Sequence, residues 1–303
     1  MASFPLTVIR TAFRIADHIA PRLAGRVAFE LFCRTPHPNR VSPGERRALD
    51  RAAPFMAEAR LHRLTTPSGW VVAHDFRPPP GTGRRRTVLV IHGWRSRSDH
   101  MAAIVDALRR DGARVIALDL PGHGKSGGRR LNMANAVAAA AVAGAWFGPF
   151  DAVIGHSFGG AVAVNALVGS VRNVERLAAE RLVLIAAPNS MPSFFAEFGR
   201  MLDLGPRTQT ALFAHVERLT GRPLEDYVGA DQLARHPCPT LVLHAPCDKE
   251  VPAENARAFG RAGKHVRLVW APGLGHRRIL AGPGVLAELT GFVAGIREPA
   301  LVH

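Results

Sequence analysis

The sequence has few cysteines and no long apolar run, and each shortage excludes a class of protein. Its 303 residues include only Cys33, Cys238 and Cys247, too few and too scattered for a disulfide framework, and no Cys-x-x-Cys pair suggests zinc. No stretch of roughly 18 uninterrupted apolar residues occurs, which excludes a transmembrane span. Because this cysteine usage fits a reducing compartment, we expect a cytoplasmic protein without a metal ion.

Aromatic residues are also scarce, at 7%, and this bears on the strongly basic charge of +15. Such a charge raises nucleic acid as a partner. However, the basic residues are spread from Arg10 to Arg297, with only short runs such as Arg84-Arg85-Arg86. A protein that binds nucleic acid clusters its charge on one element and interleaves aromatic side chains. We therefore predict no nucleic-acid partner, and the apolar content of 47% indicates a globular core.

The N-terminal 33 residues carry the pattern of an amphipathic helix. Apolar residues recur there at spacings of three and four, namely Leu6, Ile9, Phe13, Ala16, Ala20, Leu23, Val27 and Leu31. Pro21 should break or kink this helix, and Arg10 and Arg14 interrupt any apolar segment of a secretory signal. Two placements stay open: packing on the protein, or peripheral contact of residues 4–32 with a membrane surface. We favour the packed arm.

The chain then turns to alternating strands and helices. After a helix that begins at Ser42 and a hairpin over residues 61–77, the predicted strands are Thr87–Ile91, Arg114–Leu118, Asp151–Ile154, Leu182–Ala186, Thr240–His244 and Val266–Trp270. This alternation predicts an α/β fold with a mostly parallel central sheet flanked by helices. Residues 191–237 interrupt it with helical, strand-free sequence. We therefore divide the chain into an N-terminal helical arm (1–60), an α/β core (61–190 and 238–297) and a helical insertion (191–237).

Two stretches match Gly-x-Ser-x-Gly, and their surroundings distinguish them. Gly155-His156-Ser157-Phe158-Gly159 follows a predicted strand and precedes a helix, which is the context of a nucleophile elbow. Gly124-Lys125-Ser126-Gly127-Gly128 has neither element directly beside it. The same loop matches a dinucleotide fingerprint at Gly122-x-Gly124-x-x-Gly127, but no helix begins there to hold a pyrophosphate. The sequence therefore favours Ser157 as a nucleophile and predicts no nucleotide cofactor.

A serine is a weak nucleophile unless a base takes its proton and an acid orients that base. Among the 14 histidines, His276 lies in a glycine-rich turn after a predicted strand, just before the last helix. Asp248 follows the preceding strand, and Glu250 is its nearest competitor. The order Ser157, Asp248, His276 is the one expected for this sheet topology.

Together these stretches resemble the α/β-hydrolase family, in its serine-hydrolase branch, over roughly residues 61–297. The residues that carry the resemblance are His92-Gly93-Trp94, Asp119-Leu120-Pro121-Gly122-His123-Gly124, Gly155-His156-Ser157-Phe158-Gly159-Gly160, Asp248 and Gly275-His276. The resemblance implies an oxyanion hole made by the backbone N–H groups of Phe158 and Trp94. It also implies that residues 191–237 form a cap that shapes the substrate pocket, and that no metal or organic cofactor is needed.

Further candidates for substrate contact lie near the serine and in the insertion. They are His92 and His156, together with Phe194, Phe195 and Phe198, whose helical spacing is equally typical of packing between a cap and a core. Arg277 and Arg278 directly follow His276, where they would either attract an anionic substrate or begin a helix. We favour the beginning of a helix.

The predicted activity is acyl transfer from a small-molecule carboxylic ester to water. Thioesterase, amidase, C–C hydrolase and acyltransferase reactions use the same triad and stay open as alternatives. A catalytically silent α/β-hydrolase scaffold that serves as a binding module is the alternative from another class, and the intact triad argues against it. A serine elbow argues against epoxide hydrolases and haloalkane dehalogenases. The substrate's chain length and the oligomeric state are left open.

Overall fold

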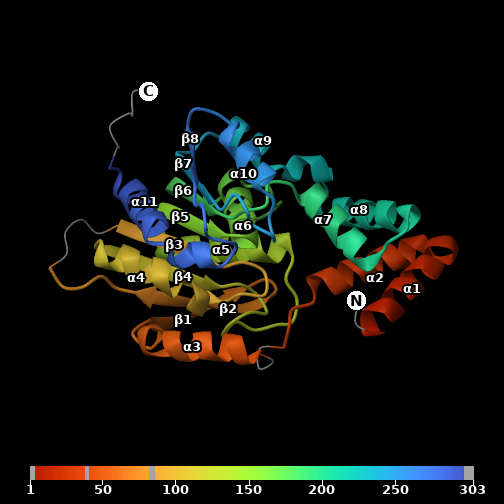
Figure 1. Cartoon of the computed structure of the whole chain (residues 1–303), viewed down its shortest axis with the longest axis horizontal. Helices are drawn as coiled ribbons and strands as arrows, with labels where there is room; N and C mark the ends of the chain where they lie inside the picture. The colour runs from red at the N-terminus through yellow and green to blue at the C-terminus, as the bar shows by residue number, and fades with distance from the viewer. Residues whose placement is uncertain (1–3, 38–40, 82–85, 297–303) are drawn as a thin grey trace. The chain divides into compact units, whose positions relative to one another are not determined.

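A sheet of eight strands forms the centre of the larger of two compact units (Figure 1). The computed structural model describes residues 4–37, 41–81 and 86–296, so Arg84, Arg85 and Arg297 lie outside the described residues. The strands are β1 (Arg60–Thr66), β2 (Gly69–Phe76), β3 (Arg86–Ile91), β4 (Ala113–Asp119), β5 (Phe150–His156), β6 (Ala179–Ile185), β7 (Thr240–His244) and β8 (Val266–Trp270). All pairs from β4 to β8 are parallel, whereas β2 is antiparallel to both β1 and β4. The predicted α/β fold with a mostly parallel sheet is confirmed.

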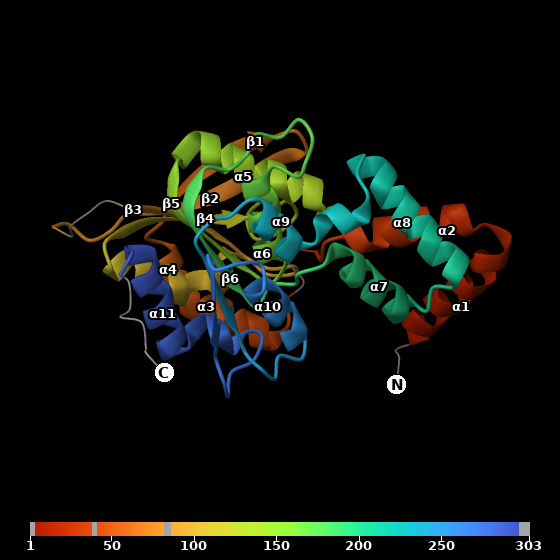
Figure 2. The same ribbon diagram turned by 90° about the horizontal axis from the view of Figure 1, so that it is seen from above.

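Helices cover both faces of this sheet, which is why the inner strands β3, β4, β5 and β7 are buried over most of their length. The helices of this larger unit are α3 (Pro43–Met56), α4 (Ala102–Arg110), α5 (Met133–Phe147), α6 (Phe158–Val168), α9 (Gly229–Arg235), α10 (Ala253–Gly260) and α11 (Pro283–Ala294), with 3₁₀ turns η1 (Ser98–Met101) and η3 (Arg278–Ala281). Figure 2 shows α5 and α6 on one face and α3, α4 and α11 on the other. In β3, Val88 and Val90 belong to the core under α4 and α11, while Leu89 and Ile91 alternate with them, and all four side chains are buried.

The strand order β1-β2-β4-β3-β5-β6-β7-β8 reverses its direction at β3. The chain passes from β3 to β4 on one side and then returns to place β5 on the other side. Such a switch point is where parallel sheets bind ligands, at the carboxyl ends of the strands. The loops after β3 and β5 therefore meet at the edge of the sheet where a site is expected.

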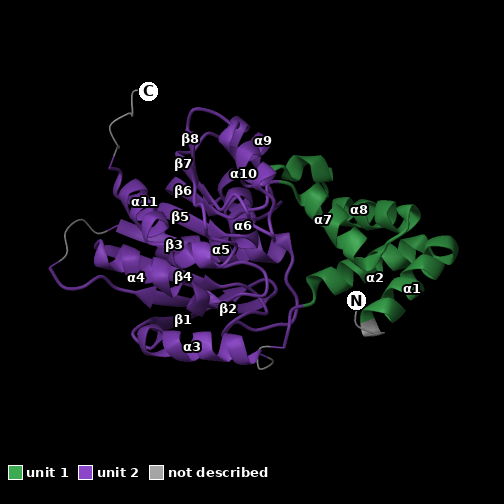
Figure 3. Ribbon diagram, viewed as in Figure 1, with its two compact units in different colours: residues 1–34, 190–228 green, residues 35–189, 229–303 purple. Residues whose placement is uncertain are grey.

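The N-terminal helices and the insertion together form a second, smaller unit (Figure 3). We call residues 1–34 and 190–228 the helical unit, and residues 35–189 and 229–303 the sheet unit. The helical unit contains α1 (Phe4–Ile19), α2 (Pro21–Cys33), α7 (Met191–Leu202), α8 (Pro206–Thr220) and η2 (Leu224–Tyr227). This division assigns α3 and α9 to the sheet unit, whereas the sequence placed α3 in the arm and α9 in the insertion. Among the described residues, no helix is long and apolar enough to cross a membrane.

The helical unit has a small core of its own. Phe13 of α1 and Ala24 and Ala28 of α2 pack with Leu202 of α7, and the ring of Phe32 lies 4.7 Å from that of Phe195. The buried carboxylate of Asp17 accepts the Thr208 N–H at the start of α8, at 2.6 Å. The N-terminal arm therefore packs against helices of the insertion.

The prediction of which apolar side chains of the arm are buried is wrong in α2. The helix does break at Pro21, the first residue of α2. The buried side of α2 carries Ala24, Ala28 and Phe29, while Leu23, Val27 and Leu31 are exposed. The reason is that the predicted period ran unbroken through Pro21, whereas a new helix starts there with its own orientation.

We predict that Gly25→Ala destabilises the helical unit, because α2 and α8 touch through this glycine. A Cβ on Gly25 would lie 2.7 Å from the Leu212 backbone nitrogen and 2.8 Å from the Ala211 carbonyl carbon. Overpacking of this kind costs about 1–3 kcal/mol. The free energy of unfolding from urea titration should fall by that amount. The control is Gly44→Ala in α3, whose Cβ would meet only an Arg47 side-chain nitrogen at 3.9 Å, and which should be neutral or stabilising. Equal effects of the two variants would contradict the packing.

Candidate active site

Ser157 occupies a strained turn between the central strand β5 and helix α6. Its φ of 53° and ψ of −127° place a non-glycine residue in a region that L-residues avoid. The turn closes tightly: a Cβ on Gly155 would lie 2.3 Å from the carbonyl oxygen of Gly159, and one on Gly159 would lie 2.4 Å from that of Ile91. The Ser157 N–H donates to the Ile185 carbonyl at 2.8 Å. The geometry leaves the Ser157 side chain half-buried at the carboxyl end of β5.

The second Gly-x-Ser-x-Gly stretch performs a structural task instead. The Ser126 hydroxyl donates to the Asp119 carbonyl at 2.6 Å and accepts the Val72 N–H at 2.8 Å. Its loop folds around the Asp119 carboxylate, which accepts the Lys125 N–H at 2.8 Å and lies 3.0 Å from Nε2 of His74. Burial raises the pKa of Asp119, but the hydrogen bond and charge of His74 outweigh it and hold the pKa well below its usual range. The loop that matched a dinucleotide fingerprint is thus wrapped around an anion of the protein itself.

Asp248 and His276 meet at the ends of β7 and β8. Oδ2 of Asp248 accepts the Nδ1–H of His276 at 2.8 Å, and Oδ1 accepts the N–H groups of Glu250 and Val251 at 2.8 and 3.0 Å. Burial raises the pKa of Asp248, but these hydrogen bonds outweigh burial and lower it. The carboxylate therefore stays ionised and fixes the orientation of the imidazole. This pair has the geometry of the acid and base predicted from the sequence.

Glu250, the competing acid, faces the opposite side of the imidazole. Its carboxylate lies 3.7 Å from Nε2 of His276 and 3.5 Å from Nε of Arg277, and it is largely exposed. It is therefore not placed to orient the ring through Nδ1. Arg278 is the first residue of η3 and donates to the Gly273 carbonyl at 3.2 Å, which agrees with the beginning of a helix.

The loop after β3 approaches Ser157 closely. A Cβ on Gly93 would lie 2.9 Å from that of Ser157, and the ring of Trp94 packs edge-on against Phe158, with centroids 5.3 Å apart. Phe158 is the first residue of α6, where backbone N–H groups have no acceptor within the helix. The two residues predicted for an oxyanion hole therefore lie on neighbouring segments beside the turn at Ser157.

A histidine from the β4 loop supports this segment. The Arg95 N–H donates to Nε2 of His123 at 3.1 Å, so that Nδ1 carries the proton and donates to the Pro121 carbonyl at 3.0 Å. Arg95 itself has a φ of 53°. His123 thus anchors Arg95, the residue next to Trp94. The sequence did not predict this role, because the motif around His123 indicates a loop after β4 but not the segment that this loop contacts.

His92 and His156, predicted as substrate contacts, are buried and bonded to the backbone. Nε2 of His92 accepts the Leu120 N–H at 3.0 Å, and its Nδ1–H donates to the Gly93 carbonyl at 2.7 Å. Nε2–H of His156 donates to the carbonyl of His276 at 2.8 Å. Burial and a neighbouring histidine, His123 and His276 respectively, lower the pKa of each ring to about 3. Both rings are therefore neutral supports of the loops around Ser157.

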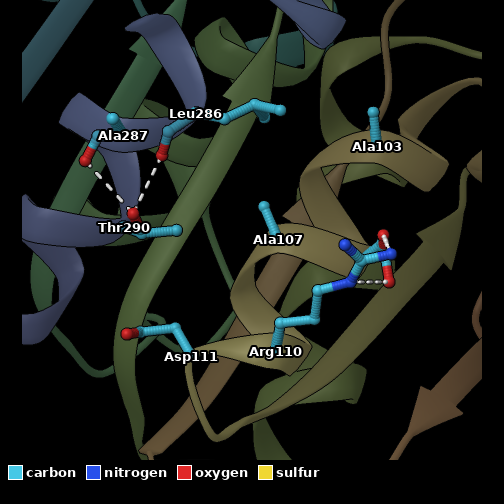
Figure 4. Close-up of a pocket in the computed structure, with 8 residues that line it drawn as sticks. Ala103, Ala107, Arg110, Asp111, Leu286, Ala287 and Thr290 are labelled. Atoms are coloured by element: carbon cyan, nitrogen blue, oxygen red, sulfur yellow. Dashed lines mark hydrogen bonds and ion pairs between the residues drawn. The ribbon is translucent and has the colours of Figure 1, made fainter. Parts of the chain in front are cut away.

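The other candidates lie elsewhere. Phe194, Phe195 and Phe198 belong to α7 of the helical unit, where their rings pack around Phe32. A shallow pocket of about 460 Å³ lies between α4 and α11, lined by residues such as Ala107 and Thr290 (Figure 4), and includes none of the predicted site residues. Among the described residues, no group of three or more His, Cys, Asp or Glu side chains is placed to hold a metal ion.

Comparison with known proteins supports this description of the fold. The model of a family described as "Alpha/beta hydrolase family" matches residues 88–289. An esterase from Exiguobacterium antarcticum is 17% identical with a TM-score of 0.57, over 77% of this chain and 98% of its own. An esterase from Rhodococcus sp. ECU1013 is 20% identical with a TM-score of 0.55, over 78% and 99%. A bromoperoxidase from Bacillus anthracis is 16% identical with a TM-score of 0.56, over 78% and 100%. No curated protein matches the chain.

We predict that Asp248→Asn lowers kcat for ester hydrolysis by about 10⁴-fold, because an amide neither fixes the imidazole tautomer nor stabilises an imidazolium. The matched variant Glu250→Gln removes a largely exposed carboxylate, and such pairs contribute about 0–1 kcal/mol. Its kcat should stay within about fivefold of the wild type. Turnover of p-nitrophenyl acetate measures both. A large loss in Glu250→Gln with a small one in Asp248→Asn would reassign the acid.

We also predict that buried neutral His156 makes the protein acid-sensitive. Its pKa is about 3 in the folded state, against about 6.5 in the unfolded chain. Between these values the unfolded state binds the proton, so stability falls as the pH falls, by up to about 1.4 kcal/mol per pH unit. In His156→Gln this slope should be smaller by that amount between pH 6 and 4, as measured by urea unfolding. The control His236→Gln removes an exposed ring. An unchanged slope in His156→Gln would refute the assignment.

Proposed function

The chain belongs to the α/β-hydrolase family, and we propose that it is a serine hydrolase that cleaves carboxylic esters of small molecules, with Ser157 as the nucleophile. The observation that carries the proposal is the hydrogen bond of 2.8 Å between buried Asp248 and His276, at the same edge of the sheet as the strained turn of Ser157. A triad needs an ionised acid, an oriented imidazole and an accessible hydroxyl. The bonded pair of Asp248 and His276 and the half-buried Ser157, at the ends of β7, β8 and β5, support this proposal.

In the proposed first step, the Ser157 hydroxyl attacks the ester carbonyl and transfers its proton to Nε2 of His276. Asp248 keeps the proton of His276 on Nδ1, so that Nε2 is free to accept, and it stabilises the imidazolium that forms. The backbone N–H groups of Phe158 and Trp94 stabilise the oxyanion of the tetrahedral intermediate, and one such donor contributes about 10²–10³ in rate.

The intermediate then collapses to an acyl-enzyme as His276 protonates the departing alcohol. Water attacks the acyl group, gives its proton to His276 and releases the acid, and Ser157 recovers its proton. Atoms balance over the cycle without a cofactor. Asp248 keeps its charge throughout because its lowered pKa opposes protonation by the imidazolium.

Carboxylic esters are proposed over other acyl substrates because two similar structures are described as esterases. These likenesses concern the fold, and a fold of this kind supports many reactions. Thioesters, amides and activated C–C bonds use the same triad, so a panel of matched substrates discriminates among them. None of the three cysteines forms a disulfide, which supports our proposal of a reducing, cytoplasmic location.

We predict that Ser157→Ala abolishes hydrolysis of p-nitrophenyl acetate and covalent labelling by a fluorophosphonate probe, because both require the nucleophile. Ser126→Ala is the matched control in the second Gly-x-Ser-x-Gly stretch. It loses the hydrogen bonds to the Asp119 carbonyl and to the Val72 N–H of β2, so its melting temperature should fall while folded protein still turns over and takes the label. Labelling that persists in Ser157→Ala would identify another nucleophile, and an unlabelled wild-type protein would favour a binding scaffold.

A further inference from the structure

Exposed aliphatic side chains concentrate on the two N-terminal helices. Among the described residues, eleven large apolar side chains are exposed, and six of these belong to α1 and α2: Val8, Ile15, Ile19, Leu23, Val27 and Leu31. Ile19 is 76% exposed and Leu23 is 62% exposed. The other five are spread over the remainder of the described chain. A concentration of this kind marks a surface that meets an apolar partner.

The six side chains form a row along each helix. Val8, Ile15 and Ile19 recur at spacings of seven and four in α1, and Leu23, Val27 and Leu31 recur at spacings of four in α2. The opposite sides carry Phe13 and Ala28, which pack within the helical unit. We call the six exposed residues the outer face. The helices are thus apolar on two sides, and their own core uses only one.

The charges beside the outer face are almost all positive. Arg22 and Arg26 are exposed on α2 within one turn of Leu23 and Val27, and Arg14 on α1 pairs with Asp203. Glu30 is the one exposed acidic residue described in α1 and α2, because Asp17 is buried beneath Thr208. Aliphatic rows bordered by arginines are typical of helices that lie at a membrane interface.

We propose that α1 and α2 dock on an anionic lipid surface, with the outer face at the acyl boundary and Arg22 and Arg26 against the lipid phosphates. The charges favour this partner over a second copy of the chain, because two identical faces would bring arginines of like charge together. With 16 and 13 residues, the helices are too short to span a bilayer and instead lie along it.

The test is cosedimentation of the full-length protein with vesicles of phosphatidylcholine alone or with phosphatidylglycerol added. Binding should need phosphatidylglycerol and should weaken as NaCl increases from 50 to 500 mM, because salt screens the arginine charges. Ile19→Ser/Leu23→Ser should weaken binding by about tenfold or more, since each aliphatic side chain that enters the lipid contributes substantially. Arg22→Gln/Arg26→Gln should also weaken it, by about tenfold or more.

Two double variants serve as controls. Leu61→Ser/Ile296→Ser removes two exposed aliphatic side chains outside the outer face, and Arg47→Gln/Arg51→Gln removes two exposed charges from α3. Both should bind as the wild type does. Ser157→Ala should also bind fully, so that failure of the proposed reaction and failure of docking are separate results.

Two results would overturn the proposal. One is a wild-type protein that does not sediment with anionic vesicles, or an Ile19→Ser/Leu23→Ser variant that binds them as well as the wild type does. The other is a dimer, seen by sedimentation velocity, that Ile19→Ser/Leu23→Ser converts to monomers, since this would make a second copy the occupant of the outer face.

Discussion

The close approach of two backbone segments at Ser157 is the constraint on which the candidate site depends. Strand β5 lies in the middle of the sheet with β3 and β6 beside it, and α6 must begin immediately where β5 ends. Only glycine at positions 155 and 159 lets the chain reverse so tightly. A residue in such a conformation costs about 1–3 kcal/mol, and it persists because the surrounding parallel strands and the buried helix over-determine it. This conformation places the Ser157 side chain, half-buried, at the carboxyl end of β5.

Buried polar side chains fix the loops around Ser157. His92, His123 and His156 each bridge to backbone atoms, and the buried carboxylate of Asp119 gathers the β4 loop. Replacing any of these by an apolar side chain would leave backbone groups unpaired, at about 1–3 kcal/mol each. Neutral rings serve here because a charged ring would have to be desolvated. The same buried neutral histidines that fix the loops around Ser157 therefore make the folded state less stable as the pH falls.

Local signals in the sequence predicted the sheet, the helix with Ser42 as its N-cap and the break at Pro21, because strand runs, caps and prolines act over a few residues. The paired arrangement of Asp248 and His276 was also predictable, since both follow strands whose ends share one edge. Contacts between distant segments were not. The hydrogen bond from His156 to the His276 carbonyl joins residues 120 positions apart, and no local sequence pattern around His156 indicates it. The orientation of α2 was missed because it is set by packing on α8 rather than by continuation of α1.

The helical unit is assembled from two pieces of chain, residues 1–34 and 190–228. During translation, at about 5–20 residues per second, α1 and α2 leave the ribosome roughly 8–30 s before α7 and α8 exist to pack against them. For that interval both apolar sides of the two helices are exposed to solvent. The order of synthesis thus exposes Phe13, Ala24 and Ala28 together with the outer face, whereas the folded chain buries these three side chains.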